Sequence, residues 1–137
     1  MESPMEFALL DTDVVSYRFG RRAEFEAFRP HLAGKIPAVS FVTFGEAMKG
    51  AFLASWGEKR VRALEAHLRT YLILPADRQL AATYARLRSD NQQTGVSLSD
   101  ENDWWVAATA IRYDIPLLTN DRAFRRVRGL RVLPPEP

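Results

Sequence analysis

The chain has 137 residues, of which 47% are hydrophobic and 26% charged, so it has the size and composition of one globular domain. The absence of cysteine excludes disulfides and thiolate metal sites. The net charge is only +2, but nearly all basic residues are arginines, whose planar guanidinium groups suit phosphate recognition. We find no signal peptide and no apolar run of roughly 20 residues, and therefore expect a cytoplasmic protein that does not enter a membrane.

The first predicted strand covers residues 7–10, which are all apolar and run directly into Asp11. A short, continuous apolar run is typical of a strand that is buried on both faces, as in a parallel sheet. A helix is predicted over residues 13–19, and Gly20 ends it. Asp11 is thus expected at the carboxyl end of a buried strand, the edge where open α/β sheets bind ligands.

A second helix is predicted over residues 21–32, and a β-prone run predicts the second strand over residues 38–42. The next helix is expected to begin at Thr43 and to reach about residue 54. Thr43 as N-cap with Glu46 three positions later would form a capping box.

The remaining segments alternate in the same way. Helices are predicted over residues 58–70, from a cap at Asp77 to about residue 91, over 101–113 after a cap at Ser99 or Asp100, and over 123–127. Strands are predicted over residues 72–74, 116–119 and 131–133. Alternating strands and helices indicate an α/β fold, a three-layer α/β/α sandwich with a central parallel sheet of four to five strands. We find no repeat or boundary, so residues 1–137 are expected to form a single domain.

Four acids occupy equivalent places in this pattern. Asp11 follows the first strand, and Glu46 lies early in the helix after the second. Asp121 follows the fourth strand, and Asp103 lies in the first turn of the helix before it. Because the carboxyl ends of parallel strands share one edge, all four side chains are expected there.

Each acid also has a purely structural interpretation, because Asp and Glu are common in turns and at helix N-termini. Four carboxylates at one place, however, would repel one another and raise some pKa values unless a cation is present. Oxygen ligands of this kind suit Mg²⁺, or Mn²⁺ as a substitute. The cluster therefore indicates a divalent metal site.

The sequence resembles PIN-domain nucleases, specifically the ribonuclease toxins of VapBC-type toxin–antitoxin pairs, over nearly its whole length. The resemblance rests on motifs in a fixed order: LLDTDVVSY at 9–17, VSFVTFGE at 39–46, NDWWVAATA at 102–110, LTNDRAF at 118–124 and GLRV at 129–132. It implies a PIN-like nuclease fold and an Mg²⁺-dependent endoribonuclease. It also implies a cognate VapB-like antitoxin partner and frequently a homodimer.

The resemblance implies catalytic and metal-binding acids at Asp11, Glu46, Asp103 and Asp121, and Thr119 matches the hydroxyl residue of the closing motif. Phosphodiester cleavage needs charge stabilisation on the phosphate and a nucleophile made from water, and divalent cations supply both. Asp11, Asp103 and Asp121 would hold metal, while Glu46 would hold metal or orient the attacking water. Arginines near the rim are candidates for holding the RNA backbone: Arg18, Arg122 and Arg125.

Three other functions are consistent with parts of the sequence. Asp11 and Asp13 match the opening motif of haloacid-dehalogenase-like phosphatases, but neither Lys49 nor Lys59 closely follows a strand, as the required lysine would. A receiver-like domain expects a lysine after its last strand, and no lysine follows Lys59. A catalytically silent, partner-binding domain would not need intact acids.

The early helices contain more aromatic residues than one core is expected to hold: Tyr17, Phe19, Phe25 and Phe28. We expect some of them to line a groove for a partner segment, because large exposed apolar patches usually mark such sites.

Overall fold

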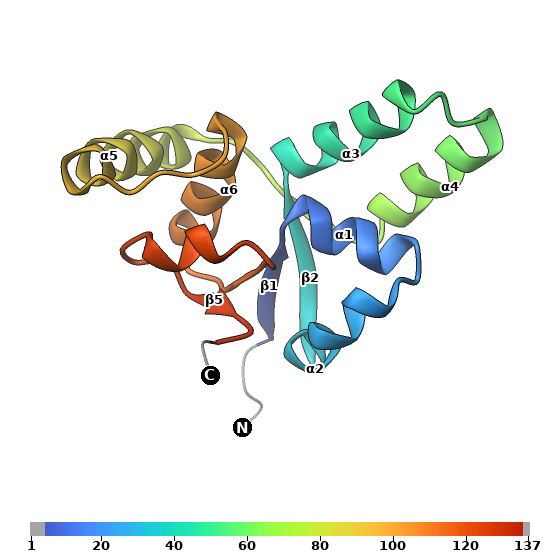
Figure 1. The fold of residues 1–137 in the computed structure, drawn as a ribbon, viewed down its shortest axis with the longest axis horizontal. Coiled ribbons are helices and arrows are strands. Elements are labelled where there is room, and N and C mark those ends of the chain that lie inside the picture. The colour runs from blue at the N-terminus through green and yellow to red at the C-terminus, as the bar shows by residue number, and fades with distance from the viewer. Residues whose placement is uncertain (1–4, 136–137) are drawn as a thin grey trace.

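A five-stranded parallel sheet forms the middle layer of the computed structural model, which describes residues 5–135 (Figure 1). The strands are β1 (Glu6–Leu10), β2 (Lys35–Ser40), β3 (Leu72–Leu74), β4 (Leu117–Leu118) and β5 (Val132–Leu133). Their order is β3-β2-β1-β4-β5, and every neighbouring pair is parallel. This confirms the expected parallel sheet.

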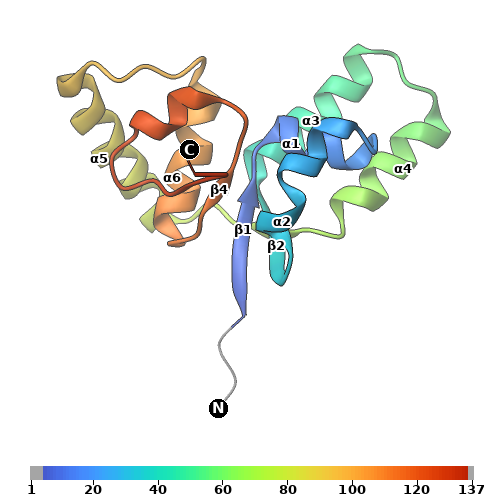
Figure 2. The ribbon, with the colours of Figure 1, turned by 60° about the horizontal axis from the view of Figure 1, so that its bottom comes forward.

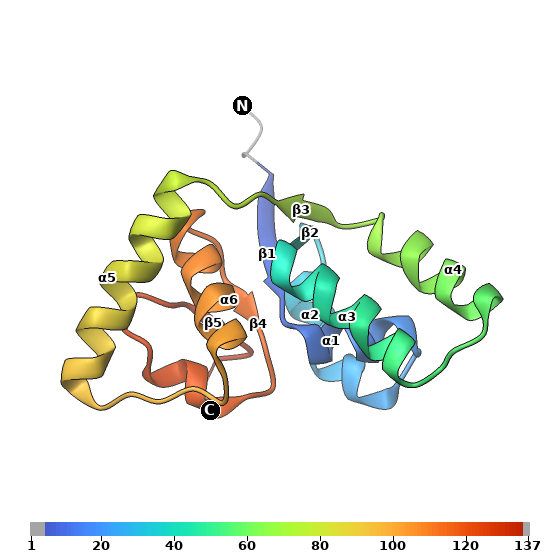
Figure 3. The ribbon, with the colours of Figure 1, turned by 90° about the horizontal axis from the view of Figure 1, so that it is seen from above.

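Helices cover both faces of the sheet, as Figures 2 and 3 show. One layer contains α1 (Thr12–Phe19), the 3₁₀ helix η1 (Ala23–Ala27), α2 (Arg29–Leu32), α3 (Phe41–Leu53) and α4 (Glu58–Leu68). The other contains α5 (Arg78–Thr94), α6 (Glu101–Arg112) and the 3₁₀ helix η2 (Arg122–Arg126). The three-layer α/β/α sandwich is therefore confirmed. None of the helices within residues 5–135 combines the length and apolar character needed to cross a bilayer.

The central strand β1 is buried on both faces, which explains its unbroken apolar sequence. Leu9 packs into the core on the α5 and α6 side, whereas Ala8 and Leu10 pack into the core beneath α1 to α4. All three side chains are fully buried. Side chains alternate across a strand, so a strand between two helical layers needs apolar residues at every position.

The start of α3 differs from the prediction, and the capping-box interpretation of Glu46 is wrong. Ser40 ends β2 and is the N-cap of α3, with its Oγ accepting a hydrogen bond from Thr43 N at 3.1 Å. The helix therefore begins at Phe41, and Glu46 lies in its second turn. Both Ser40 and Thr43 can cap a helix, and the position at which β2 leaves the sheet selects Ser40.

Residues 21–32 do not form one helix, because η1 and α2 divide the segment. Pro30 has no N–H group and is tolerated only in the first turn of an α-helix, so a helix starting at residue 21 cannot pass through it. The predicted end of α5 is also too early. The helix continues to Thr94, and Gly95 ends it with a φ of 78°, a conformation that glycine adopts without strain.

The four aromatic residues of the early helices divide into two pairs. Phe25 and Phe28 are buried in the core. Tyr17 and Phe19 remain partly exposed. They line a groove of about 400 Å³ together with Trp56 of the α3–α4 connection.

Candidate active site

The candidate site lies where the connections of the sheet change direction. The chain proceeds from β1 through β2 to β3 on one side, and then returns to place β4 and β5 on the other side of β1. The crevice between the carboxyl ends of β1 and β4 is thus a topological switch point, where α/β proteins bind ligands. Asp11 directly follows β1, and Thr119 directly follows β4.

Asp11 is the most buried acid of the site, with 7% of its surface exposed. It is the N-cap of α1, and its Oδ1 accepts a hydrogen bond from Thr12 N at 2.8 Å. Its Oδ2 accepts a hydrogen bond from Thr119 Oγ1, also at 2.8 Å. The pKa of Asp11 is raised to about 6 despite these two bonds, chiefly by burial and to a smaller extent by the charges of Asp13 and Glu46.

Thr119 connects two of the acids. Its hydroxyl donates to Asp11 and accepts a hydrogen bond from Asp121 N at 3.1 Å. Asp121 Oδ1 in turn accepts a hydrogen bond from Ala123 N at 2.9 Å and caps η2. Asp121 is therefore a helix cap, and the cap also fixes this carboxylate at the edge where Asp11 lies.

Glu46 is held by side chains from two other helices. Thr12 Oγ1 donates to Glu46 Oε1 at 2.7 Å, and Asn102 Nδ2 donates to Glu46 Oε2 at 3.4 Å. Thr12 Oγ1 also lies 3.2 Å from Thr43 Oγ1, which accepts a hydrogen bond from Ser40 Oγ at 3.3 Å. A line of hydroxyl groups thus runs from the end of β2 to Glu46 and orients its carboxylate.

This role was not predicted for Thr12, Ser40, Thr43 or Asn102. Thr12 and Asn102 are direct neighbours of Asp11 and Asp103, which is the only signal in the sequence that marks them. Their hydrogen bonds join elements that are far apart in the chain, and local sequence patterns do not predict such contacts.

Asp103 lies in the first turn of α6 and is half-buried. Its backbone N–H donates to Asp100, the N-cap of this helix, at 3.0 Å. The pKa of Asp103 is raised to about 7, first by burial and then by the charges of four acids: Asp100, Asp11, Glu46 and Asp121. Because the charges of the other three predicted acids act on Asp103, the four acids lie near one another at this edge of the sheet.

The donor set suits a hard divalent cation, because it consists of carboxylate and hydroxyl oxygens with excess negative charge. The acids are near enough to repel one another. However, within residues 5–135 no three acidic or histidine side chains lie close enough to form a finished metal site. All five predicted site residues lie at one edge, whereas Asp13 is exposed on α1.

A model of the PIN domain matches residues 8–130, and the chain belongs to this family of nucleases. A curated relative, Ribonuclease VapC1 of Haemophilus influenzae, is 28% identical over 126 residues, which cover 90% of this chain and 93% of the relative. PIN-domain nucleases generally depend on a metal ion.

Two solved structures extend the similarity to the fold. VapBC-1 from nontypeable Haemophilus influenzae has a TM-score of 0.77 and 26% identity, over 92% of this chain and 96% of that one. A toxin–antitoxin complex from Klebsiella pneumoniae has a TM-score of 0.68 and 25% identity, over 90% of this chain and 94% of that one. Membership of the family argues against the phosphatase and receiver-like alternatives.

Proposed function

We propose that this PIN domain is an Mg²⁺-dependent endoribonuclease and the toxin of a VapBC-type pair. The proposal is supported by the placement of Asp11, Glu46, Asp103 and Asp121 at the carboxyl edge of the sheet, near enough for the other three charges to help raise the pKa of Asp103. A protein without a cationic ligand gains nothing from this repulsion, which destabilises its fold. The similarity to Ribonuclease VapC1 supports RNA as the substrate.

The side chains have distinct roles in this proposal. Asp11, Asp103 and Asp121 hold the cation, and Glu46 holds it or orients the attacking water. Thr119 positions Asp11 through its hydroxyl group. A bound Mg²⁺, with Mn²⁺ as substitute, would stabilise charge on the scissile phosphate and make water easier to ionise.

Proton release accompanies cation binding in this site. Asp103, with a pKa of about 7, is only partly ionised at neutral pH, and a carboxyl must be deprotonated to bind metal. Thr12 and Asn102 hold both oxygens of Glu46, so this carboxylate keeps its orientation without the cation.

The partner in this proposal is an antitoxin, because solved structures of similar fold are VapBC and toxin–antitoxin complexes. The groove beside α1 contains Tyr17, Phe19 and Trp56 together with Thr12 and Glu46 of the acid site. An apolar segment bound there would cover the approach to the acids. We further expect a cytoplasmic location and a homodimer.

The test is to incubate the purified chain with single-stranded RNA, para-nitrophenyl phosphate and acetyl phosphate, with Mg²⁺, Mn²⁺ or EDTA. We expect RNA to be cut in the presence of either metal, and not in EDTA or by Asp103→Asn. Glu58→Gln, a change at an exposed acid of α4, is the matched control and should keep full activity. Release of para-nitrophenol with intact RNA would favour the phosphatase instead, and no reaction at all would favour a silent binding domain.

A further inference from the structure

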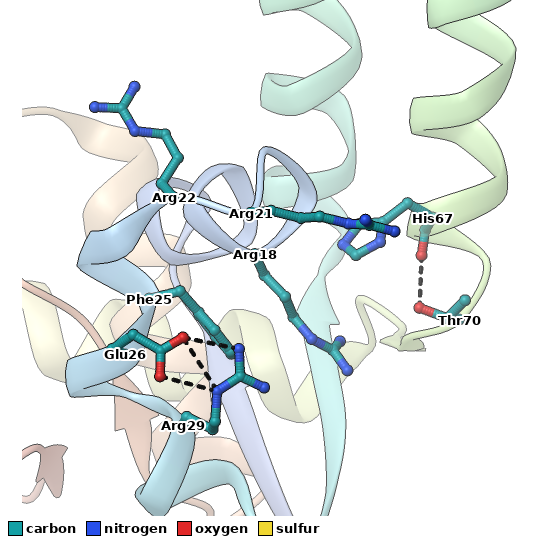
Figure 4. A pocket seen from close by; sticks show the side chains of 8 residues that line it. All are labelled: Arg18, Arg21, Arg22, Phe25, Glu26, Arg29, His67 and Thr70. Atoms are coloured by element: carbon teal, nitrogen blue, oxygen red, sulfur yellow. Dashed lines mark hydrogen bonds and ion pairs between the residues drawn. The ribbon is translucent and has the colours of Figure 1, made fainter.

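An arginine-rich pocket of about 520 Å³ lies at the far end of α1 from Asp11. All but one of its lining residues have a charged or polar side chain: Arg18, Arg21, Arg22, Phe25, Glu26, Arg29, His67 and Thr70 (Figure 4). In Figure 4 the side chains of Arg18 from α1 and Arg21 from the turn after it extend toward α4, while Arg22 points away. We propose that this pocket binds a phosphate group of the RNA strand, a proposal that rests on the proposed ribonuclease function.

The charge of the pocket is not balanced by its own acids. Arg29 forms an ion pair with Glu26 at 3.0 Å, and Arg22 forms one with Glu24 at 2.8 Å. Within residues 5–135 neither Arg18 nor Arg21 has a carboxylate partner. The pocket therefore has a surplus of positive charge that an anion would neutralise.

Arg18 is the strongest single indication of a missing ligand. Its guanidinium carbon lies 5.2 Å from the centre of the Tyr71 ring, and its Nη1 is buried with no hydrogen-bond partner among the described residues. A buried donor without an acceptor is rare, because each such group is destabilising. A phosphate in the pocket supplies the negative charge that this guanidinium lacks.

The structure also separates the three arginines that were candidates for backbone contacts. Arg125 donates to Pro134 O at 2.6 Å, so its guanidinium already has an acceptor. Arg122 is exposed at the start of η2 and lines none of the described pockets. Only Arg18 combines a buried unsatisfied donor with a pocket.

A nucleic acid strand explains the surroundings better than an acidic peptide does. Arg22 lines both this pocket and the neighbouring groove, which contains Thr12 and Glu46 of the acid site. The groove presents aromatic rings, and the guanidinium of Arg60 lies 3.6 Å from the centre of the Trp56 ring. A peptide site is expected to have several apolar anchors, whereas the pocket itself offers only Phe25.

The test measures RNA binding rather than cleavage, in the Asp103→Asn background and in EDTA so that the RNA stays intact. The affinity for a short, fluorescent single-stranded RNA is measured at several salt concentrations for Arg18→Gln/Arg21→Gln. The control is Arg78→Gln/Arg131→Gln, which removes the same charge. Arg131 pairs with Asp114 before β4, and Arg78 begins α5 beside the Asp77–Arg112 pair, both far from the acids.

We expect the pocket variant to bind RNA roughly tenfold more weakly and to lose about 0.7 from its salt slope, as one lost phosphate contact requires. The control should change neither quantity. The affinity for a poly-glutamate peptide is measured in parallel. Equal RNA affinities of the pocket variant and the control would overturn the proposal. A pocket variant that keeps its RNA affinity and loses only its affinity for poly-glutamate would overturn it as well. Arg21→Gln alone, at an exposed position, shows the same direction of change even if replacing Arg18 impairs folding.

The outcome also separates this proposal from the proposed function. A wild-type chain that cuts RNA, with pocket variants that bind it normally, refutes the phosphate pocket alone. A chain that binds RNA through the pocket but does not cut it refutes the nuclease function alone. A chain that neither binds nor cuts RNA refutes both.

Discussion

Thr119 Oγ1 donates a 2.8 Å hydrogen bond to Asp11 Oδ2. The two residues are 108 positions apart in the chain, and each directly follows one of the adjacent strands β4 and β1. Thr119 is 1% exposed and Asp11 is 7% exposed, so water cannot easily replace either partner. The bond spans the switch point between β1 and β4. It therefore fixes the deepest carboxylate of the site relative to the closing strand of the sheet.

Replacing Thr119 by valine should destabilise the folded protein, because it removes this hydrogen bond. The change keeps the shape of the side chain but leaves Asp11 Oδ2 and Asp121 N without their partner. We expect the free energy of unfolding to fall by about 1–3 kcal/mol, the usual cost of leaving a buried polar group unsatisfied. Chemical denaturation measures this change. Thr119→Ser keeps the hydroxyl group and is the control, and a valine variant as stable as the serine variant would contradict the prediction.

The stability of the metal-free protein should depend on pH in a direction that is unusual for carboxylates. The pKa of Asp11 rises from 3.8 to about 6 on folding, and that of Asp103 to about 7, so the folded state holds these protons more tightly. The stabilisation that protonated Asp11 and Asp103 contribute to the folded state is complete below the pKa of the unfolded chain. It is lost as the pH rises through 6 to 7. We expect Asp11 alone to make the protein more stable at about pH 5 than at about pH 8 by on the order of 1–2 kcal/mol.

Asp103→Asn tests the source of this dependence. The change removes a charge that four neighbouring acids repel, so in EDTA at about pH 8 it should stabilise the fold, by on the order of 1 kcal/mol, and flatten the pH dependence. Saturating Mg²⁺ should stabilise the wild type at high pH but not the variant. Denaturation curves at both pH values provide the measurement, and a variant with an unchanged pH profile would be evidence against carboxylate repulsion.

Glu46→Gln separates orientation from chemistry. Ser40 rather than Thr43 caps α3, so the change should not weaken the helix start, and glutamine can still accept the hydrogen bond of Thr12. We expect the free energy of unfolding to change by less than about 1 kcal/mol, while RNA cleavage falls at least tenfold because the charge is lost. Melting temperature and cleavage rate are measured side by side with Glu58→Gln. A variant with full cleavage activity would show that the charge of Glu46 is not needed for the reaction.

The antitoxin and the metal should compete for the acid cluster. A partner in the groove beside α1 can reach Glu46, and an inserted arginine would replace the charge of the cation. Linkage then requires that each weakens the other by the same factor. Partner affinity is measured with and without millimolar Mg²⁺ at constant ionic strength, so that screening stays equal. An affinity independent of Mg²⁺ would mean that the partner blocks RNA without entering the metal site.

The sequence alone determined the layers of the fold and the positions of the acids. Unbroken apolar runs such as residues 7–10 identify strands buried on both faces, and these runs are local features. Each acid stands at a strand end or in the first turns of a helix, so the parallel topology carries all four to one edge. The cap at Asp77 was likewise evident from local sequence, and Asp100 was one of the two caps predicted for α6.

The tertiary structure decided what depends on distant neighbours. Ser40 and Thr43 are equally good caps by sequence, and pairing of β2 with β3 up to Ser40 determines which one is used. The links from Thr12 to Glu46 and from Thr119 to Asp11 join different elements, as does the burial that raises the pKa of Asp11. Arg18 is marked only by the lack of an acceptor around it. Burial and unsatisfied hydrogen bonds are properties of the packed chain, because they depend on which residues far apart in sequence surround each group.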